Sequence, residues 1–121
     1  DMRIPIQYAL TFPHKYPMPT KQIDFITLNK LSFKAMDNNR FPLIKLAYQV
    51  GKLAGNMPTV YNTSNEVAVD LFLKGEICFL DIEEIIFEAV GNAIYIASPT
   101  IEEIIDTSTI TKKTILDKYR H

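Results

Sequence analysis

Residues 57–79 (MPTVYNTSNEVAVDLFLKGEICF) constrain the fold most, because they combine a helical period with signals for the ends of a helix. Gly75 can take the left-handed conformation that ends a helix. The spacing predicts a central, mostly buried helix over this stretch. Its apolar residues recur at helical spacing and so share one face: Val60, Val67, Ala68, Leu71 and Phe72.

The same stretch offers two starts for this helix. Thr63 and Glu66 have the spacing of a capping box, in which each side chain satisfies a backbone N–H group. Pro58 offers an earlier start, because proline fits the first turn of a helix.

Three polar residues stand beside the apolar face: Asn62, Asn65 and Glu66. One interpretation is a small catalytic site in which the carboxylate and the amides point at a substrate. The other is that they cap the helix or form hydrogen bonds in the core, roles that suit these residue types at a helix start. We favour the structural interpretation, because no neighbouring His or Cys completes a catalytic set.

The composition limits the classes of protein to which the chain can belong. The chain has 121 residues, of which 47% are hydrophobic and 22% are charged, as in an ordinary globular domain. Its net charge of −1 gives no electrostatic reason to expect nucleic acid or an anionic membrane as a partner. Cys78 stands between two apolar residues, which predicts a buried, inert thiol. A single cysteine fits a reducing compartment, so we expect a cytoplasmic protein.

Residues 1–40 read as an N-terminal arm and linker. Residues 3–12 are typical of a short helix, which Pro13 stops. Pro17 and Pro19 then mark an extended connector. The alternation Leu31-Ser32-Phe33-Lys34 is typical of one short strand, which needs a partner from elsewhere.

Residues 41–121 read as a helical domain. Pro42 opens its first helix, within which Gly51 is tolerated. Asp81 caps a later helix, with Glu84 at the spacing of a capping box.

The C-terminal part of this domain carries two further signals. Ser98-Pro99-Thr100 marks another helix start, and residues 106–109 predict a break, because Asp, Thr and Ser favour caps over helix interiors. A last helix follows from about residue 108 to residue 119. The fold class is therefore mainly α, a small array of four to five helices that is superhelical and not a regular bundle.

No motif in the chain indicates a particular chemical activity. Its four glycines form no phosphate-binding loop. His14 and His121 lack metal-ligand spacing with another His or Cys. The residues therefore predict no catalytic, cofactor-binding or metal-binding side chain.

Four stretches nevertheless carry a family resemblance. DMRIPIQYALTFP resembles the pattern DMR-x-PI-x-YALT-x-P of the 1-deoxy-D-xylulose 5-phosphate reductoisomerases. RFPLIKLAYQVGKLAGNMP, PTVYNTSNEVAVDLFLKGEICFLDI and TIEEIIDT are similar to later stretches of the same family, in the same order. The chain departs from the family at Leu43, where Cys is common, at Tyr61, where Leu is usual, and at Thr63-Ser64, where the family has two alanines.

The resemblance implies a C-terminal fragment, linker and helical domain, of an enzyme that uses NADPH and a divalent metal, Mg²⁺ or Mn²⁺. This enzyme converts 1-deoxy-D-xylulose 5-phosphate to 2-C-methyl-D-erythritol 4-phosphate in non-mevalonate isoprenoid synthesis. The implied partners of the fragment are the upstream catalytic and NADPH-binding domains and a second copy, as in a homodimer. The fragment itself would bind neither cofactor nor metal and would be inactive.

One residue of the chain matches a family segment near the substrate. In Asp1-Met2-Arg3, the Met2 position covers the substrate in the family, so the resemblance places Met2 beside the substrate. The alternative function is a free-standing helical module that binds a partner protein in a groove.

Overall fold

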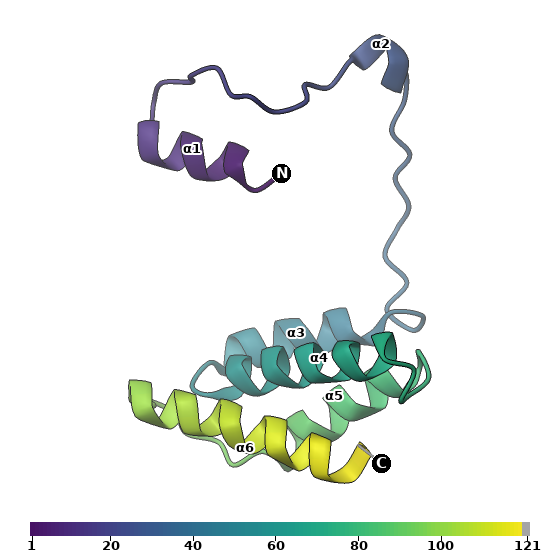
Figure 1. The fold of residues 1–121 in the computed structure, drawn as a ribbon, viewed down its shortest axis with the longest axis vertical. Helices are drawn as coiled ribbons and strands as arrows, with labels where there is room; N and C mark the ends of the chain where they lie inside the picture. The colour runs from purple at the N-terminus through teal and green to yellow at the C-terminus, as the bar shows by residue number, and fades with distance from the viewer. Residues whose placement is uncertain (120–121) are drawn as a thin grey trace. The chain divides into compact units, whose positions relative to one another are not determined.

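The computed structural model describes residues 1–119, which form six α-helices in two compact units, Asp1–Ala35 and Met36–His121 (Figure 1). The mainly α class is confirmed, and no helix within residues 1–119 has the length and hydrophobicity needed to cross a membrane. The helices are α1 (Arg3–Thr11), α2 (Phe25–Leu28), α3 (Pro42–Leu53), α4 (Met57–Leu73), α5 (Asp81–Asn92) and α6 (Ile101–Tyr119).

The first unit contains α1 and α2 joined by an extended connector. α1 confirms the short helix predicted before Pro13. α2 is a single turn that was not among the predicted elements. Its N-cap is Asp24, whose carboxylate accepts hydrogen bonds from the Ile26 N–H at 3.0 Å and the Thr27 hydroxyl at 2.6 Å. The Thr27 hydroxyl is the main cause of the lowered pKa of Asp24.

The strand predicted at Leu31–Lys34 is wrong. These residues are extended but belong to no sheet, and the backbone makes no hydrogen bond there with another described segment. A strand is stable only when a neighbour pairs with its backbone, and alternation of side chains alone does not supply that neighbour.

The second unit is built around α4, which packs against α3, α5 and α6 (Figure 1). The predicted inward face of the central helix is confirmed, because Val60, Val67, Ala68 and Leu71 are buried and Phe72 is half-buried against the core. The hydrophobic core draws on all four helices and consists of Leu46, Val50, Met57, Val60, Val67, Ala68, Leu71, Ile82, Ile85, Ile86 and Ile115.

α4 begins at the earlier of its two candidate starts, with Pro58 in the first turn, so the capping box of Thr63 and Glu66 is wrong. Thr63 lies inside the helix, where its hydroxyl is buried and lies 3.0 Å from the hydroxyl of Ser108 on α6. After the helix, Gly75 has φ +75°, which confirms its predicted left-handed conformation.

The start of α5 also differs from the prediction. Asp81 is the first helical residue and not the N-cap, and its carboxylate accepts a 2.6 Å hydrogen bond from the N–H of Cys78. Glu84 completes no capping box with it among the described hydrogen bonds. The bond to Asp81 holds Cys78 in the α4–α5 connection, where its side chain is exposed, so the prediction of a buried thiol is wrong.

α6 is continuous through residues 106–109, and the predicted break is wrong. The hydroxyls of Thr107 and Thr109 donate to the carbonyls of Glu103 and Ile105, at 2.7 Å and 2.9 Å, so they are satisfied within the helix. The predicted start is confirmed by a capping box: the Thr100 hydroxyl accepts from the Glu103 N–H at 3.2 Å, and the Glu103 carboxylate accepts from the Thr100 N–H at 2.7 Å.

Candidate functional site

The polar residues singled out on α4 form no enclosed site. The Asn62 amide donates to the Glu66 carboxylate at 3.0 Å, one helical turn away, and both side chains are exposed. Asn65 is half-buried beside them. Met2 lies in the other unit, where its side chain is exposed immediately before α1. The structure therefore brings Asn62 and Glu66 together on a solvated surface.

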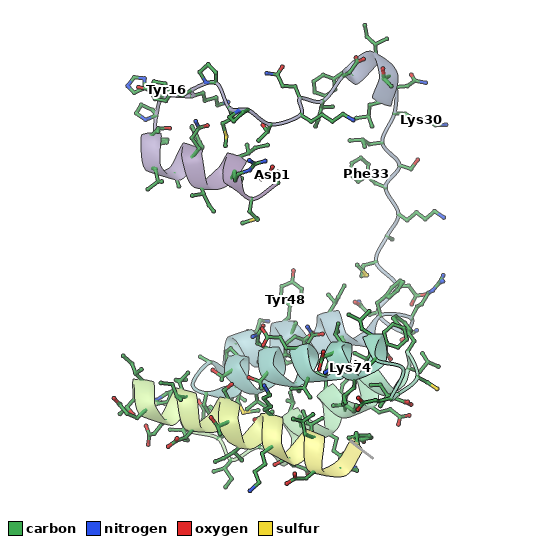
Figure 2. All side chains as sticks on the ribbon, in the orientation of Figure 1. Asp1, Tyr16, Lys30, Phe33, Tyr48 and Lys74 are labelled. Carbon is green, nitrogen blue, oxygen red and sulfur yellow. The ribbon has the colours of Figure 1, made fainter. Side chains whose placement is uncertain are left out.

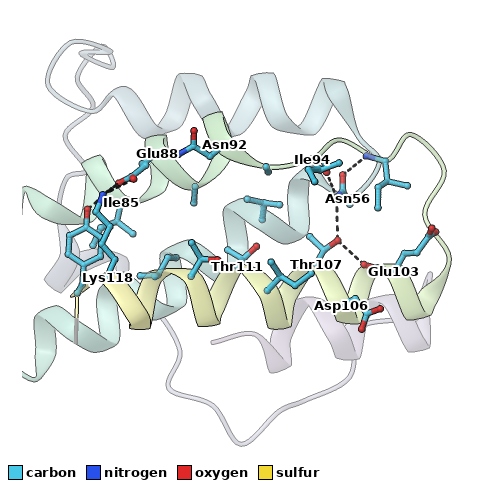
Figure 3. Close-up of a pocket in the computed structure, with 18 residues that line it drawn as sticks. Asn56, Ile85, Glu88, Asn92, Ile94, Glu103, Asp106, Thr107, Thr111 and Lys118 are labelled. Carbon is cyan, nitrogen blue, oxygen red and sulfur yellow. Dashed lines mark hydrogen bonds and ion pairs between the residues drawn. The ribbon is translucent and has the colours of Figure 1, made fainter. Parts of the chain in front are cut away.

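A cavity of about 420 Å³ lies in the second unit between α5, α6 and the segment that joins them (Figure 3). Most of its wall is apolar, and hydroxyls of three threonines on α6 line one side. The residues that carry the wall are Val60, Ile85, Ala89, Ala93, Ile94, Ile96, Thr107, Ile110, Thr111, Thr114 and Ile115.

An ion pair closes one end of this cavity. The Lys118 ammonium lies 2.7 Å from both carboxylate oxygens of Glu88, and the Tyr119 hydroxyl donates to the same carboxylate at 3.2 Å. The hydrogen bond from Lys118 lowers the pKa of Glu88, and the Glu88 carboxylate in turn raises the pKa of Lys118. Both groups are thus held charged, and the pair joins α5 to α6 across the mouth of the cavity.

Asn56 closes the other end. Its side chain is 2% exposed, and its amide donates to the Ile94 carbonyl at 2.9 Å and to the Thr107 hydroxyl at 3.3 Å. Its amide oxygen accepts from the Ile96 N–H at 2.9 Å, and its backbone N–H donates to the Ile96 carbonyl at 3.1 Å. One buried side chain therefore ties the start of α4 to the α5–α6 connection and to α6 (Figure 3).

Gly55 makes this junction possible. Its φ is +61°, and a Cβ built there would lie 2.2 Å from the carbonyl oxygen of Ile96. Only glycine fits here, because the backbone is left-handed and lies against the backbone of the α5–α6 connection. Sequence reasoning missed the junction, although the pair Gly55-Asn56 directly before a helix start was a usable signal.

The cavity offers room for a bound molecule, but its side chains form no catalytic arrangement. Its one cation, Lys118, is paired with Glu88, and a second carboxylate of the wall, Glu103, accepts from the Thr100 N–H. The other polar groups of the wall are the Asp106 carboxylate and neutral hydroxyls and amides. Among residues 1–119, no three His, Cys, Asp or Glu side chains lie close enough together to hold a metal ion.

A second hollow of about 390 Å³ lies on the outer face of α3. It is lined by Ile44, Ala47, Tyr48, Gly51 and Lys52 of α3 and by Tyr61 of α4. Tyr48 points away from the core and is 72% exposed (Figure 2). The Tyr61 hydroxyl donates to the Leu43 carbonyl at 3.2 Å, and burial raises the pKa of Tyr61.

Comparison with known proteins gives a consistent result. The family described as the DXP reductoisomerase C-terminal domain matches residues 1–114. The 1-deoxy-D-xylulose 5-phosphate reductoisomerase of Shouchella clausii (strain KSM-K16) is 52% identical over 105 residues, which are 86% of this chain and 28% of that protein. The reductoisomerase of Bacillus cereus (strain AH187) is 41% identical over 119 residues, which are 98% of this chain and 31% of that protein.

The fold has the same relatives. The solved 1-deoxy-D-xylulose 5-phosphate reductoisomerase from Zymomonas mobilis, in complex with NADPH, matches with a TM-score of 0.82 and 32% sequence identity. The match covers 100% of this chain and 32% of that one. The chain thus spans less than a third of the length of each of these relatives.

Proposed function

The chain belongs to the DXP reductoisomerase C-terminal domain family, and we propose that it is the structural C-terminal part of an NADPH-dependent reductoisomerase. The reaction is the conversion of 1-deoxy-D-xylulose 5-phosphate to 2-C-methyl-D-erythritol 4-phosphate. The observation that carries the proposal is the family match over residues 1–114, together with 52% identity to a named reductoisomerase. In this proposal residues 1–40 are the end of the catalytic domain and the linker, and residues 41–121 form a helical domain that braces the catalytic domain in the cytoplasm.

The described residues do not fit NADPH or a divalent metal. The four glycines lie at residues 51, 55, 75 and 91, too far apart for a loop that cradles phosphates. No group of three metal-ligating side chains is present in residues 1–119. We therefore place both groups in the upstream domains and derive no step of the reaction through them here. Met2 is the one residue that we place next to the substrate, by its position in the family's DMR segment.

The isolated 121-residue chain is expected to show no oxidation of NADPH in the presence of 1-deoxy-D-xylulose 5-phosphate and Mn²⁺. The physical reason is that it carries neither the phosphate-binding loop nor the carboxylates that such a reaction needs. The decrease in absorbance of NADPH measures this, with the full-length enzyme as the positive control. Turnover by the isolated chain, or an inactive full-length enzyme, would contradict the proposal.

A homodimer is part of the proposal, and the first unit supports it. Its apolar side chains are exposed along the whole arm, including Leu10 at 82% and Phe12, Phe25 and Phe33. Apolar surface of this extent is normally covered by another protein surface. We expect the isolated chain to self-associate through residues 1–35, so its weight-average mass in sedimentation should rise with concentration. A strictly monomeric chain at all concentrations would refute this.

The alternative function is a free-standing helical interaction module. Such a module would bind a separate partner protein and would not need upstream domains. The reading frame before Asp1 decides between the two, because only the reductoisomerase needs a dinucleotide-binding domain there.

A further inference from the structure

α3 is apolar on two opposite sides. Its inner side carries Leu46 and Val50, which are buried in the core. Its outer side carries Ile44 and Tyr48, and Phe41 directly precedes the helix; all three are exposed. Figure 2 shows Tyr48 pointing away from the other helices of the unit. A helix that is hydrophobic on both sides is typical of one buried between two layers, and the second unit supplies only the inner layer.

Gly51 lies on this outer side, in the last turn of the helix, two residues before its end at Leu53. A glycine in a helix interior destabilises it by roughly 0.5–1 kcal/mol relative to alanine. Apart from its chain neighbours and the backbone of its own helix, no atom lies within 4 Å of the position that a Cβ would take there, so packing within the unit does not require glycine. The missing side chain deepens the hollow beside Tyr48, which leaves room for a side chain or backbone from outside.

The charges around the hollow favour an acidic partner. Lys45 and Lys52 are seven residues apart on α3 and therefore lie along the same edge of its outer side. Both are exposed, and the helix from Pro42 to Leu53 contains no Asp or Glu. A surface with an apolar centre and a cationic edge is complementary to one with an apolar centre and carboxylates at its rim.

We propose that the outer side of α3 is the docking surface for the upstream region of the same polypeptide. An apolar side chain of that region enters the hollow at Gly51, and carboxylates face Lys45 and Lys52. The inference rests on the proposed function, and the length of the chain supports this occupant. The match covers only 32% of the solved reductoisomerase, so more than two thirds of such a polypeptide lies outside the residues described. α3 is also the first helix of its unit, so in the sequence it directly follows the arm and linker of residues 1–40.

The experiment compares oxidative labelling of Tyr48 by hydroxyl radicals in two proteins, the full-length enzyme and the isolated 121-residue chain. Tyr48 is 72% exposed in the chain, so it should be labelled readily there. In the full-length enzyme we expect about fivefold less labelling, because side chains at the centre of an interface are desolvated. Peptide mass spectrometry measures the labelling at each tyrosine.

The variant Gly51→Leu tests the hollow itself. In the isolated chain it is expected to raise the melting temperature by roughly 2–8 °C, because leucine favours the helix and meets no atom there. In the full-length enzyme the same leucine fills the hollow, so the protection of Tyr48 should be lost. Gly91→Leu is the matched control: Gly91 is also helical with open space around it, and it lies on α5. It should leave Tyr48 protected.

Three outcomes would overturn the inference. Equal labelling of Tyr48 in both proteins would show that the face stays free, and retained protection in Gly51→Leu would show that nothing enters the hollow. Protection that fades on dilution would assign the face to a second copy. Turnover of NADPH by the full-length enzyme is measured separately. An active enzyme with a freely labelled Tyr48 refutes this inference alone, whereas an inactive enzyme refutes the proposed function.

Discussion

Replacing Gly55 with alanine is expected to destabilise the second unit by about 3–5 kcal/mol. An alanine at φ +61° carries the strain of the left-handed region, and its Cβ would lie 2.2 Å from the Ile96 carbonyl oxygen. That atom is backbone and cannot swing aside, so the α5–α6 connection must move away from the start of α4. The hydrogen bonds of Asn56 with Ile94 and Ile96 would lengthen as a result. Urea unfolding followed by circular dichroism measures the change.

Gly75→Ala is the matched control for this prediction. Gly75 also has a positive φ, +75°, but no atom lies within 4 Å of its would-be Cβ. It therefore carries the backbone strain without the collision and is expected to cost only about 1–2 kcal/mol. If both variants lose the same stability, the close approach to Ile96 contributes nothing and the prediction fails.

Leu71→Ala is expected to destabilise the chain by roughly 2–5 kcal/mol, as the truncation of a large side chain in a packed core does. Leu71 is 1% exposed on α4, the helix that the other three surround. The midpoint of chemical unfolding measures the loss. Leu73→Ala removes the same atoms two residues later, from a side chain that is 76% exposed, and should change stability by no more than about 0.5 kcal/mol. An unchanged midpoint for Leu71→Ala would mean that α4 does not form the core.

The elements that local sequence signals specify were predictable. α3 begins at Pro42, and α6 begins after Thr100, because proline at the first turn and a capping box act within a few residues. The buried face of α4 follows from spacing alone, since its period does not depend on which elements cover it. The resemblance to the reductoisomerases was also available in the sequence, because it rests on ordered stretches of residues.

Some of the failed predictions depended on partners distant in the sequence, and the one at Cys78 depended on a partner three residues away. Thr63 and Ser108 both favour caps in isolation, yet each lies inside a helix because the two hydroxyls meet across α4 and α6. Their pairing could not be foreseen before the two helices were placed side by side. Cys78 has apolar neighbours in the sequence, but the bond between its N–H and Asp81 sets the course of the connection and leaves the thiol outside. The strand at Leu31–Lys34 failed for the same reason, since a strand is defined by its neighbour.

The candidate sites also depend on contacts that the sequence alone does not show. The pair Gly55-Asn56 before a helix start marks a special backbone position, but the partners of Asn56 could not be predicted from it. These partners, Ile94, Ile96 and Thr107, come from a later part of the chain. The hollow at Gly51 could not be predicted from the sequence either. A glycine within a helical pattern indicates only that it is tolerated there, and the structure is needed to show that no other element covers the outer side of α3.

The bonds of Asn56 also have a consequence for the growing polypeptide. Its partners come 38, 40 and 51 residues later in the chain. At a synthesis rate of about 5–20 residues per second, Thr107 leaves the ribosome roughly 3–10 s after Asn56 does. Until Ile94 and Ile96 emerge within that interval, α3 and α4 can already pair, but the amide at the start of α4 has only water to bind. The helical unit is therefore completed from its C-terminal end, when α6 emerges and the amide exchanges that water for protein.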